Sequence, residues 1–104
     1  MDALTRLETI VTERLAADPA SSYVASLKAN GLPAIARKLG EEATEAVVAA
    51  LAGSDEELVG EAADVLFHLT VLLAAKGIAL ERVMAELERR EGTSGHVEKA
   101  GRSA

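Results

Sequence analysis

The sequence predicts an all-α fold: an antiparallel bundle of four to five helices in a single domain over residues 1–104, with a polar tail from about residue 92. Apolar residues recur at helical spacing through most of the chain. Only two prolines interrupt them, and no segment shows the alternation of a β-strand. A chain of 104 residues is also the size of one domain.

The first two helices follow from apolar spacing and from capping residues. One face of the first helix is formed by Leu4, Leu7, Val11 and Leu15. We expect this helix to end at Asp18-Pro19, because the residue before a proline avoids the α region. Ser21 and Ser22 can cap a short second helix, and Gly31 is its expected C-terminal stop.

Three further helices have clear start and stop signals. Pro33 suits the first turn of a third helix, which should stop at Gly53. Ser54 and Glu57 form a capping box, which begins a fourth helix that ends near Lys76-Gly77. A fifth helix is marked by Leu80, Val83, Met84 and Leu87.

The fourth helix is unusual because its second half is apolar almost all round. Residues 65–75 read VLFHLTVLLAA. A helix that is apolar on every side is normally buried on every side. A monomer of 104 residues has little room to surround one of its own helices. We therefore expect the chain to form a homodimer through this helix.

Composition excludes several classes of site. The chain has no cysteine, which rules out disulfides, thiolate metal sites and cysteine nucleophiles. Its only aromatic residues are Tyr23 and Phe67, its net charge is −6 and its pI is about 4.9, so we expect no nucleic-acid partner. The uninterrupted apolar runs are too short to span a bilayer and no signal peptide is evident, so we expect no membrane association and a cytoplasmic location.

The acidity is concentrated in one block. Residues 41–64 contain eight of the 17 acidic residues and no Lys or Arg, and the remainder of the chain is slightly basic. Two like charges repel by about 4 kcal/mol at about 4 Å and an effective dielectric constant near 20. The block is therefore either a solvated acidic face or a set of carboxylates that requires a counter-ion.

The spacing of the carboxylates favours a cation site. Glu42 and Glu45 are one turn apart at the edge of the buried face of the third helix. Glu61 and Asp64 flank the apolar stripe of the fourth helix in the same way. If these consecutive helices pack antiparallel, the four carboxylates converge, and an all-oxygen ligand set selects Mg²⁺ or Mn²⁺. His68 either orients a carboxylate or is a hydrogen-bonded core residue, and the second role is the more common.

The same residues resemble a known enzyme superfamily. Glu41-Glu42-x-x-Glu45 followed by Glu61-x-x-Asp64 resembles the all-α nucleoside triphosphate pyrophosphatases. Residues 22–27, 53–64 and 90–95 are similar to the phosphoribosyl-ATP pyrophosphatase family of histidine biosynthesis. The likeness covers about residues 5–100.

The resemblance implies a reaction and a set of roles. The reaction is Mg²⁺-dependent hydrolysis of phosphoribosyl-ATP between its α and β phosphates, which gives phosphoribosyl-AMP and pyrophosphate. The implied metal ligands are Glu42, Glu45, Glu61 and Asp64. The expected catalytic carboxylates are Glu41, Glu42 and Glu45, although Glu41 faces another direction and could assist the water, hold a second metal or be solvated.

Substrate phosphates need cations and hydrogen-bond donors besides the metal. Lys38 could pair either with a phosphate or with a ligand carboxylate, and a turn at residues 92–95 offers backbone N–H groups. Ser22 could be only a helix cap, Tyr23 could only pack, and Arg90 could be surface at a helix end. With those alternatives open, the expected substrate-binding residues are Ser22, Tyr23, Lys38, Arg90, Thr93, Ser94 and Lys99.

Two other functions are compatible with these residues. The first is a house-cleaning pyrophosphatase for (deoxy)nucleoside triphosphates, which would use the same carboxylates and a different base and ribose pocket. The second is an inert helical dimerisation module with a solvated acidic face. A panel of substrates separates the two enzymes, and the effect of Mg²⁺ on melting separates either enzyme from the inert module.

Overall fold

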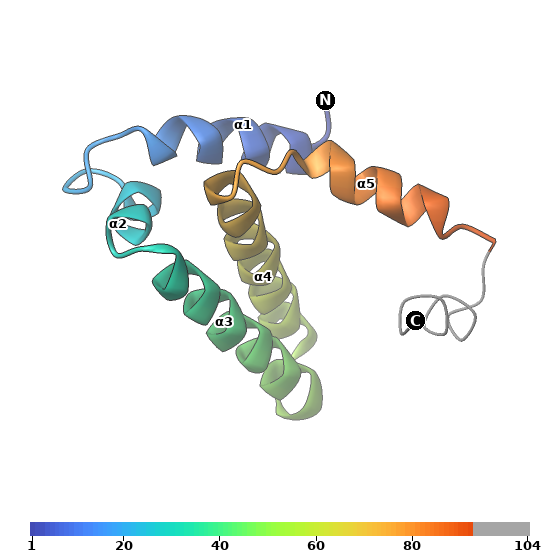
Figure 1. The fold of residues 1–104 in the computed structure, drawn as a ribbon. Helices are drawn as coiled ribbons and strands as arrows, with labels where there is room; N and C mark the ends of the chain where they lie inside the picture. The colour runs from blue at the N-terminus through green and yellow to red at the C-terminus, as the bar shows by residue number, and fades with distance from the viewer. Residues whose placement is uncertain (93–104) are drawn as a thin grey trace.

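The computed structural model describes residues 1–92, and these residues form five α-helices with no β-strand among them (Figure 1). The all-α prediction is confirmed. The helices are α1 (Ala3–Leu15), α2 (Tyr23–Ala29), α3 (Leu32–Ala52), α4 (Asp55–Ala75) and α5 (Leu80–Arg89). The long helices α3 and α4 form an antiparallel hairpin, and α1 and α2 lie across its open end.

The helix ends are set largely by the predicted caps. Ser22 Oγ accepts the backbone N–H of Ala25 at 3.2 Å and begins α2. Ser54 and Glu57 form the expected capping box: Ser54 Oγ accepts the backbone N–H of Glu57 at 3.1 Å, and the Glu57 carboxylate accepts the backbone N–H of Ser54. Gly53 ends α3, so the hairpin turn is one of the best predicted parts of the chain.

Of the first two helix ends, one differs from the sequence prediction and one agrees with it. The helix α1 ends at Leu15, three residues before Asp18, because Asp18 makes a turn of its own in which its side chain accepts the backbone N–H of Ala20. The helix α2 ends at Ala29 with Asn30 as its C-cap, so Gly31 follows the helix end as expected, and it also serves as the N-cap of α3. With φ of 94° Gly31 occupies a region that favours glycine, so it redirects the chain between the two helices.

The hydrophobic core lies where α1 and α2 cover one end of the hairpin. We call this end the hairpin root and define it by its buried apolar residues, which are Val11, Val24, Leu27, Ile35 and Val71. Leu7, Leu15 and Phe67 pack around them. Each of the first four helices contributes to the root, so it is the part of the protomer that holds the helices together.

The other end of the hairpin is apolar and uncovered. We call it the hairpin tip and define it by Val47, Val48, Leu51 and Val59. Leu51 is 83% exposed and Val59 is 69% exposed. No segment within residues 1–92 covers the tip (Figure 1).

The helix α4 is the one described helix long and apolar enough to cross a membrane by length and composition alone. Within its most apolar 18-residue window, only 17% of the residues are buried in the protomer. The expectation that α4 is buried on all sides is therefore not met by one protomer. A core helix of a soluble assembly passes the same test of length and composition.

The last helix, α5, runs away from the hairpin (Figure 1). Its N-cap residue, Ala79, provides no side-chain cap. Instead, Glu8 Oε2 of α1 accepts the backbone N–H of Leu80 at 2.6 Å, across 72 positions of sequence. A carboxylate at the start of a helix satisfies a free N–H and complements the helix dipole, so α1 supplies the cap that α5 lacks.

Candidate metal centre

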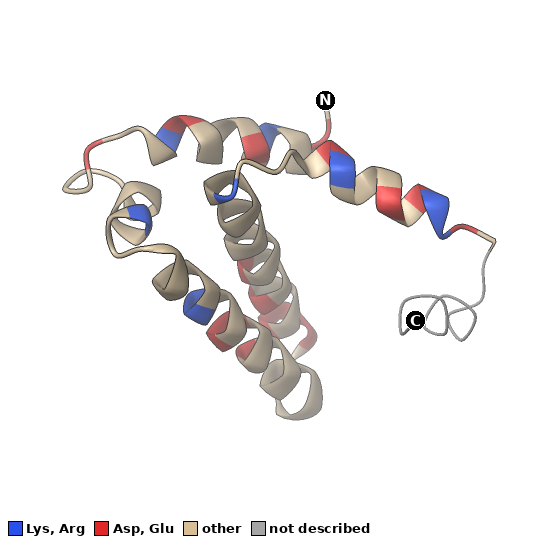
Figure 2. Ribbon diagram, viewed as in Figure 1, with Lys and Arg blue, Asp and Glu red and all other residues tan. Residues whose placement is uncertain are grey.

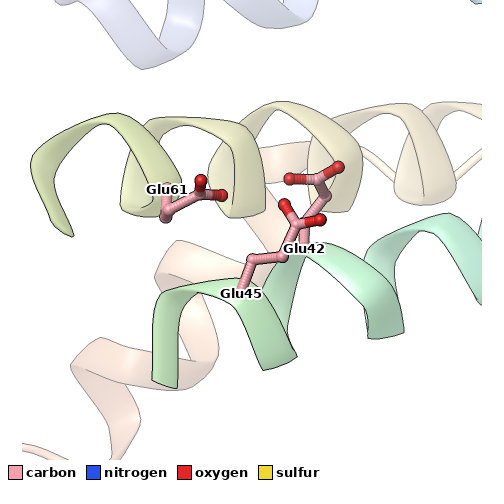
Figure 3. Close-up of side chains that lie close together, drawn as sticks. All are labelled: Glu42, Glu45 and Glu61. Atoms are coloured by element: carbon pink, nitrogen blue, oxygen red, sulfur yellow. The ribbon is translucent and has the colours of Figure 1, made fainter. Parts of the chain in front are cut away.

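Three glutamates from α3 and α4 converge between the root and the tip of the hairpin (Figure 3). Glu42, Glu45 and Glu61 each offer a carboxylate oxygen, and these oxygens lie within 4.8 Å of one another. We call these three residues the glutamate cluster. Glu42 and Glu45 are one turn apart on α3, and Glu61 faces them from α4 because the capped turn at Gly53-Ser54 folds the two helices back on each other.

Glu42 is the buried member of the glutamate cluster, with 5% of its surface exposed. Its Oε1 lies 3.1 Å from Nζ of Lys38, one turn earlier on α3. This hydrogen bond is the main reason that the pKa of Glu42 is below its ordinary value and that the pKa of Lys38 is above its own. Glu42 is thus held as an anion, and Lys38 as a cation, at the edge of the site.

The pKa of Glu45 is shifted in the opposite direction. Its pKa is raised, first because its protonated carboxyl would share a hydrogen with Glu42 and Glu61, and then because the two negative charges oppose its ionisation. Two carboxylates of different pKa therefore lie side by side, which is the arrangement expected where a cation or a proton is held.

The glutamate cluster fits a divalent cation. Among the described residues, Glu42 Oε2 and Glu61 Oε2 are buried and have no hydrogen-bond partner. Buried acceptors without a donor are rare in native proteins, and each is a candidate site for an ion. With Glu45 ionised, three negative charges meet and one lysine compensates them, so a hard cation such as Mg²⁺ or Mn²⁺ is the matching occupant.

The fourth expected ligand and the remaining expected carboxylate lie at the margin. Asp64 is exposed and does not belong to the group whose oxygens converge, although it lies one turn after Glu61 on the same helix. Glu41 is also exposed and pairs with Arg37 at 4.0 Å and with Lys38 at 3.8 Å. Figure 2 shows these positive and negative positions as neighbouring bands along α3.

His68 is a hydrogen-bonded core residue, as the sequence favoured. It is buried, and its Nδ1 lies 2.7 Å from the backbone oxygen of Asp64, not from the Asp64 carboxylate. Its Nε2 lies 2.9 Å from the hydroxyl of Tyr23. Sequence alone does not predict the pairing of Tyr23 with His68, because the two residues are 45 positions apart.

Two shallow grooves adjoin the glutamate cluster. One of about 390 Å³, between α2 and α3, is lined by Leu27, Asn30, Pro33, Ala34, Arg37, Lys38 and Glu41. The other, of about 300 Å³, runs from Glu45 and Glu61 toward the hairpin tip. The first groove carries the positive charges, so it is the side from which an anionic ligand can approach.

The expected substrate-binding residues are divided by the fold. Tyr23 on α2 and Lys38 on α3 lie near the glutamate cluster, and Ser22 is buried as the N-cap of α2. Arg90 is the C-cap of α5, 4.0 Å from Glu86, on the helix that runs away from the hairpin. Thr93, Ser94 and Lys99 lie outside the described residues.

Comparison with known proteins gives one consistent result. The family described as phosphoribosyl-ATP pyrophosphohydrolase matches residues 4–91. A relative from Erythrobacter litoralis, named phosphoribosyl-ATP pyrophosphatase, is 64% identical over 102 residues, covering 98% of each chain. A relative of the same name from Novosphingobium aromaticivorans is 61% identical over 102 residues, covering 98% of this chain and 95% of its own. Another from Cereibacter sphaeroides is 56% identical, with 98% and 99% coverage. The chain therefore belongs to the phosphoribosyl-ATP pyrophosphohydrolase family.

Proposed function

We propose that this protein hydrolyses phosphoribosyl-ATP to phosphoribosyl-AMP and pyrophosphate, a step of histidine biosynthesis. The observation that carries the proposal is the convergence of Glu42, Glu45 and Glu61 in a chain that belongs to this family over residues 4–91. The acidic face is not uniformly solvated, because one of its members is buried and two of its oxygens have no donor. This favours a cation site over an inert dimerisation module.

The residues that would hold the cation are Glu42, Glu45 and Glu61, with Asp64 as a fourth ligand from α4. Asp64 is exposed and lies one turn after Glu61 on the same helix, so its carboxylate would have to turn toward the cluster to join this ligand set. Bound Mg²⁺ would supply charge neutralisation for the substrate phosphates and would acidify a water molecule. Mn²⁺ would satisfy the same oxygen ligands.

The chain's own groups divide the remaining work. Arg37 and Lys38 line the groove beside the glutamate cluster and would bind substrate phosphates. Glu45 is the exposed member of the glutamate cluster, so a water molecule can reach its carboxylate, whereas Glu42 is buried and paired with Lys38. Glu45 would therefore accept the proton of the attacking water. Glu41, which is exposed and paired with both cations, would assist by keeping Arg37 and Lys38 in place.

The functional unit that we propose is a homodimer. The hairpin tip exposes Val47, Val48, Leu51 and Val59 together, and the apolar helix α4 is mostly uncovered. Contiguous apolar surface of this kind marks an interaction site. A second copy of the hairpin packed against the first would bury it as a helical bundle. A cytoplasmic location remains part of the proposal.

The test of the activity is pyrophosphate release from phosphoribosyl-ATP, with and without Mg²⁺, beside a panel of ordinary nucleoside triphosphates. We expect turnover of phosphoribosyl-ATP only with Mg²⁺. Glu42→Gln should lower kcat/KM on the order of 100-fold or more, since loss of residues that only support metal ligands already costs about 10–100-fold. Glu56→Gln is the matched control, because Glu56 is an exposed glutamate in the first turn of α4 outside the glutamate cluster.

Other outcomes would contradict specific parts of the proposal. Preferential turnover of the ordinary nucleoside triphosphates would favour the house-cleaning alternative. Unchanged activity in both Glu42→Gln and Asp64→Asn would overturn the metal assignment. Absence of turnover, together with a melting temperature that Mg²⁺ does not change, would favour the inert dimerisation module.

A further inference from the structure

A chain of two hydrogen bonds links α2 to α4 beside the glutamate cluster. The Tyr23 hydroxyl lies 2.9 Å from His68 Nε2, and His68 Nδ1 lies 2.7 Å from the backbone oxygen of Asp64. The imidazole is buried, with 5% of its surface exposed, and both Tyr23 and Phe67 meet it edge to face, at centroid distances of 5.8 and 5.2 Å. Both nitrogens of a buried histidine are therefore committed to specific partners.

The direction of the two hydrogen bonds follows from the partners. A backbone oxygen only accepts, so His68 Nδ1 carries a hydrogen and donates it to Asp64. In the neutral ring, Nε2 is then an acceptor, and the Tyr23 hydroxyl donates to it. The hydroxyl hydrogen of Tyr23 is thus directed inward, and the lone pairs of its oxygen are left for other partners.

Tyr23 stands at the rim of the proposed active site. It is the first residue of α2, its side chain is half exposed, and its ring stacks on Phe67 at a centroid distance of 6.3 Å. The charges of Lys38, Glu42 and Asp64 all act on the phenol of Tyr23. The ring therefore lies within electrostatic range of the lysine and of two expected metal ligands, Glu42 and Asp64. Burial of the ring is the main cause of its raised pKa, so the phenol stays neutral.

We infer that His68 is a positioning residue, which takes the hydroxyl hydrogen of Tyr23 and so presents the phenol oxygen to substrate as a hydrogen-bond acceptor. The inference rests on the proposed hydrolysis and extends it to the chemistry of one subsite. Phosphate oxygens in the fully ionised state offer no hydrogen, so an acceptor does not bind them. The group that Tyr23 contacts is a donor, which in a nucleotide is a ribose hydroxyl or an exocyclic amine of the base.

The kinetic test separates the two bonds of His68 with two amide variants. The Gln side chain places a carbonyl oxygen near the position of Nε2, so His68→Gln keeps an acceptor for Tyr23. The shorter Asn side chain places an amide N–H near Nδ1, so His68→Asn keeps only the bond to Asp64. We expect His68→Asn and Tyr23→Phe each to raise KM for phosphoribosyl-ATP about fivefold, the loss of one hydrogen bond, with kcat little changed.

Three features of the result identify positioning rather than packing. His68→Gln should keep a KM near that of the wild type. The double variant Tyr23→Phe/His68→Asn should show no more loss than either single variant, because both remove the same interaction. Thr70→Val is the matched control. Thr70 is also buried on α4, and its hydroxyl donates to the backbone oxygen of Leu66, four residues earlier, at 2.7 Å. This hydrogen bond does not involve Tyr23. Additive losses, or equal losses in Thr70→Val and His68→Asn, would overturn the inference.

A spectroscopic arm keeps the inference testable if a His68 variant does not fold or if the proposed reaction fails. Tyr23 is half exposed, so Tyr23→Phe should fold as the wild type does. The ring nitrogens of His68 in ¹⁵N-labelled protein should show a hydrogen on Nδ1 and an accepting Nε2 whose resonance moves in Tyr23→Phe. A hydrogen on Nε2, or an unmoved resonance, would overturn the inference whatever the substrate. Lack of phosphoribosyl-ATP turnover with the expected resonances would overturn only the proposed function.

Discussion

The root and the tip of the α3–α4 hairpin are built from the same two helices and have opposite environments. At the root, Ile35 is 1% exposed and α1 and α2 close over it. At the tip, Leu51 is 83% exposed, and no described segment lies against it. The tip is exposed although it carries apolar side chains on both helices, because α1 and α2 cover only the root. The root is therefore the core of the protomer, and the tip is the surface on which the proposed homodimer depends.

The largest expected effect comes from the root. Ile35→Ala removes a fully buried side chain and should lower the free energy of unfolding by about 2–5 kcal/mol, the range for large-to-small substitutions in cores. Urea denaturation monitored by circular dichroism at fixed protein concentration measures the loss. Leu51→Ala is the matched substitution at the tip. In a monomer it would have almost no effect, so a clear loss of stability there would place Leu51 in an interface.

The next effect concerns the tip directly. Leu51→Lys introduces a charge that is harmless on a solvated surface and costly in an apolar interface. We expect the dissociation constant of the dimer to rise at least about tenfold, which corresponds to about 1.4 kcal/mol. Sedimentation velocity across a range of protein concentrations measures it. A monomeric wild-type protein at all concentrations would contradict the comparison of root and tip.

The smallest expected effect concerns the glutamate cluster, which lies between the two ends. Without Mg²⁺ at pH 7, Glu45→Gln should raise the melting temperature by a few degrees, because it removes a charge that Glu42 and Glu61 oppose. The same variant should lose much of the melting shift that Mg²⁺ gives the wild type. Differential scanning calorimetry with and without Mg²⁺ measures both.

The sign of the pH dependence is fixed by the raised pKa of Glu45. The folded state binds the proton of Glu45 more tightly than the unfolded state does. The stability that the protonated carboxyl provides is therefore fully present at a pH below 4.5, the ordinary pKa of a glutamate. That stability is lost as the pH rises from 4.5 through the raised folded-state pKa. The increase in melting temperature that Glu45→Gln gives at pH 7 should therefore disappear at pH 4. An advantage that is equal at pH 4 and pH 7 would mean that the substitution acts by packing.

Much of the fold was predictable because its signals are local. The capping box at Ser54 and Glu57 and the proline at the start of α3 each act within a few residues, and each is confirmed. The early end of α1 was not predicted, because the turn that Asp18 makes with Ala20 competes with the helix. Gly31 follows the end of α2 as predicted, but its second role as the N-cap of α3 was not predicted, since a glycine offers no side-chain cap to identify it.

The candidate site was predictable to the extent that it depends on helix periodicity. Spacing of three residues placed Glu42 and Glu45 on one side of α3, and the short turn brought Glu61 opposite them. Periodicity did not distinguish Glu61 from Asp64, because the rotation of two helices about their axes depends on packing at the root. It also could not pair Tyr23 with His68, a contact that requires α2 to lie against α4.

The hydrogen bond from the Leu80 backbone N–H to the Glu8 carboxylate determines where α5 begins. It fixes the start of α5 against α1, and a helix of 10 residues then carries its far end about 15 Å from that joint. Arg90, the C-cap of α5, lies at this far end. The N-terminal helix, which contributes no residue to the glutamate cluster, thereby determines where Arg90 lies relative to the hairpin.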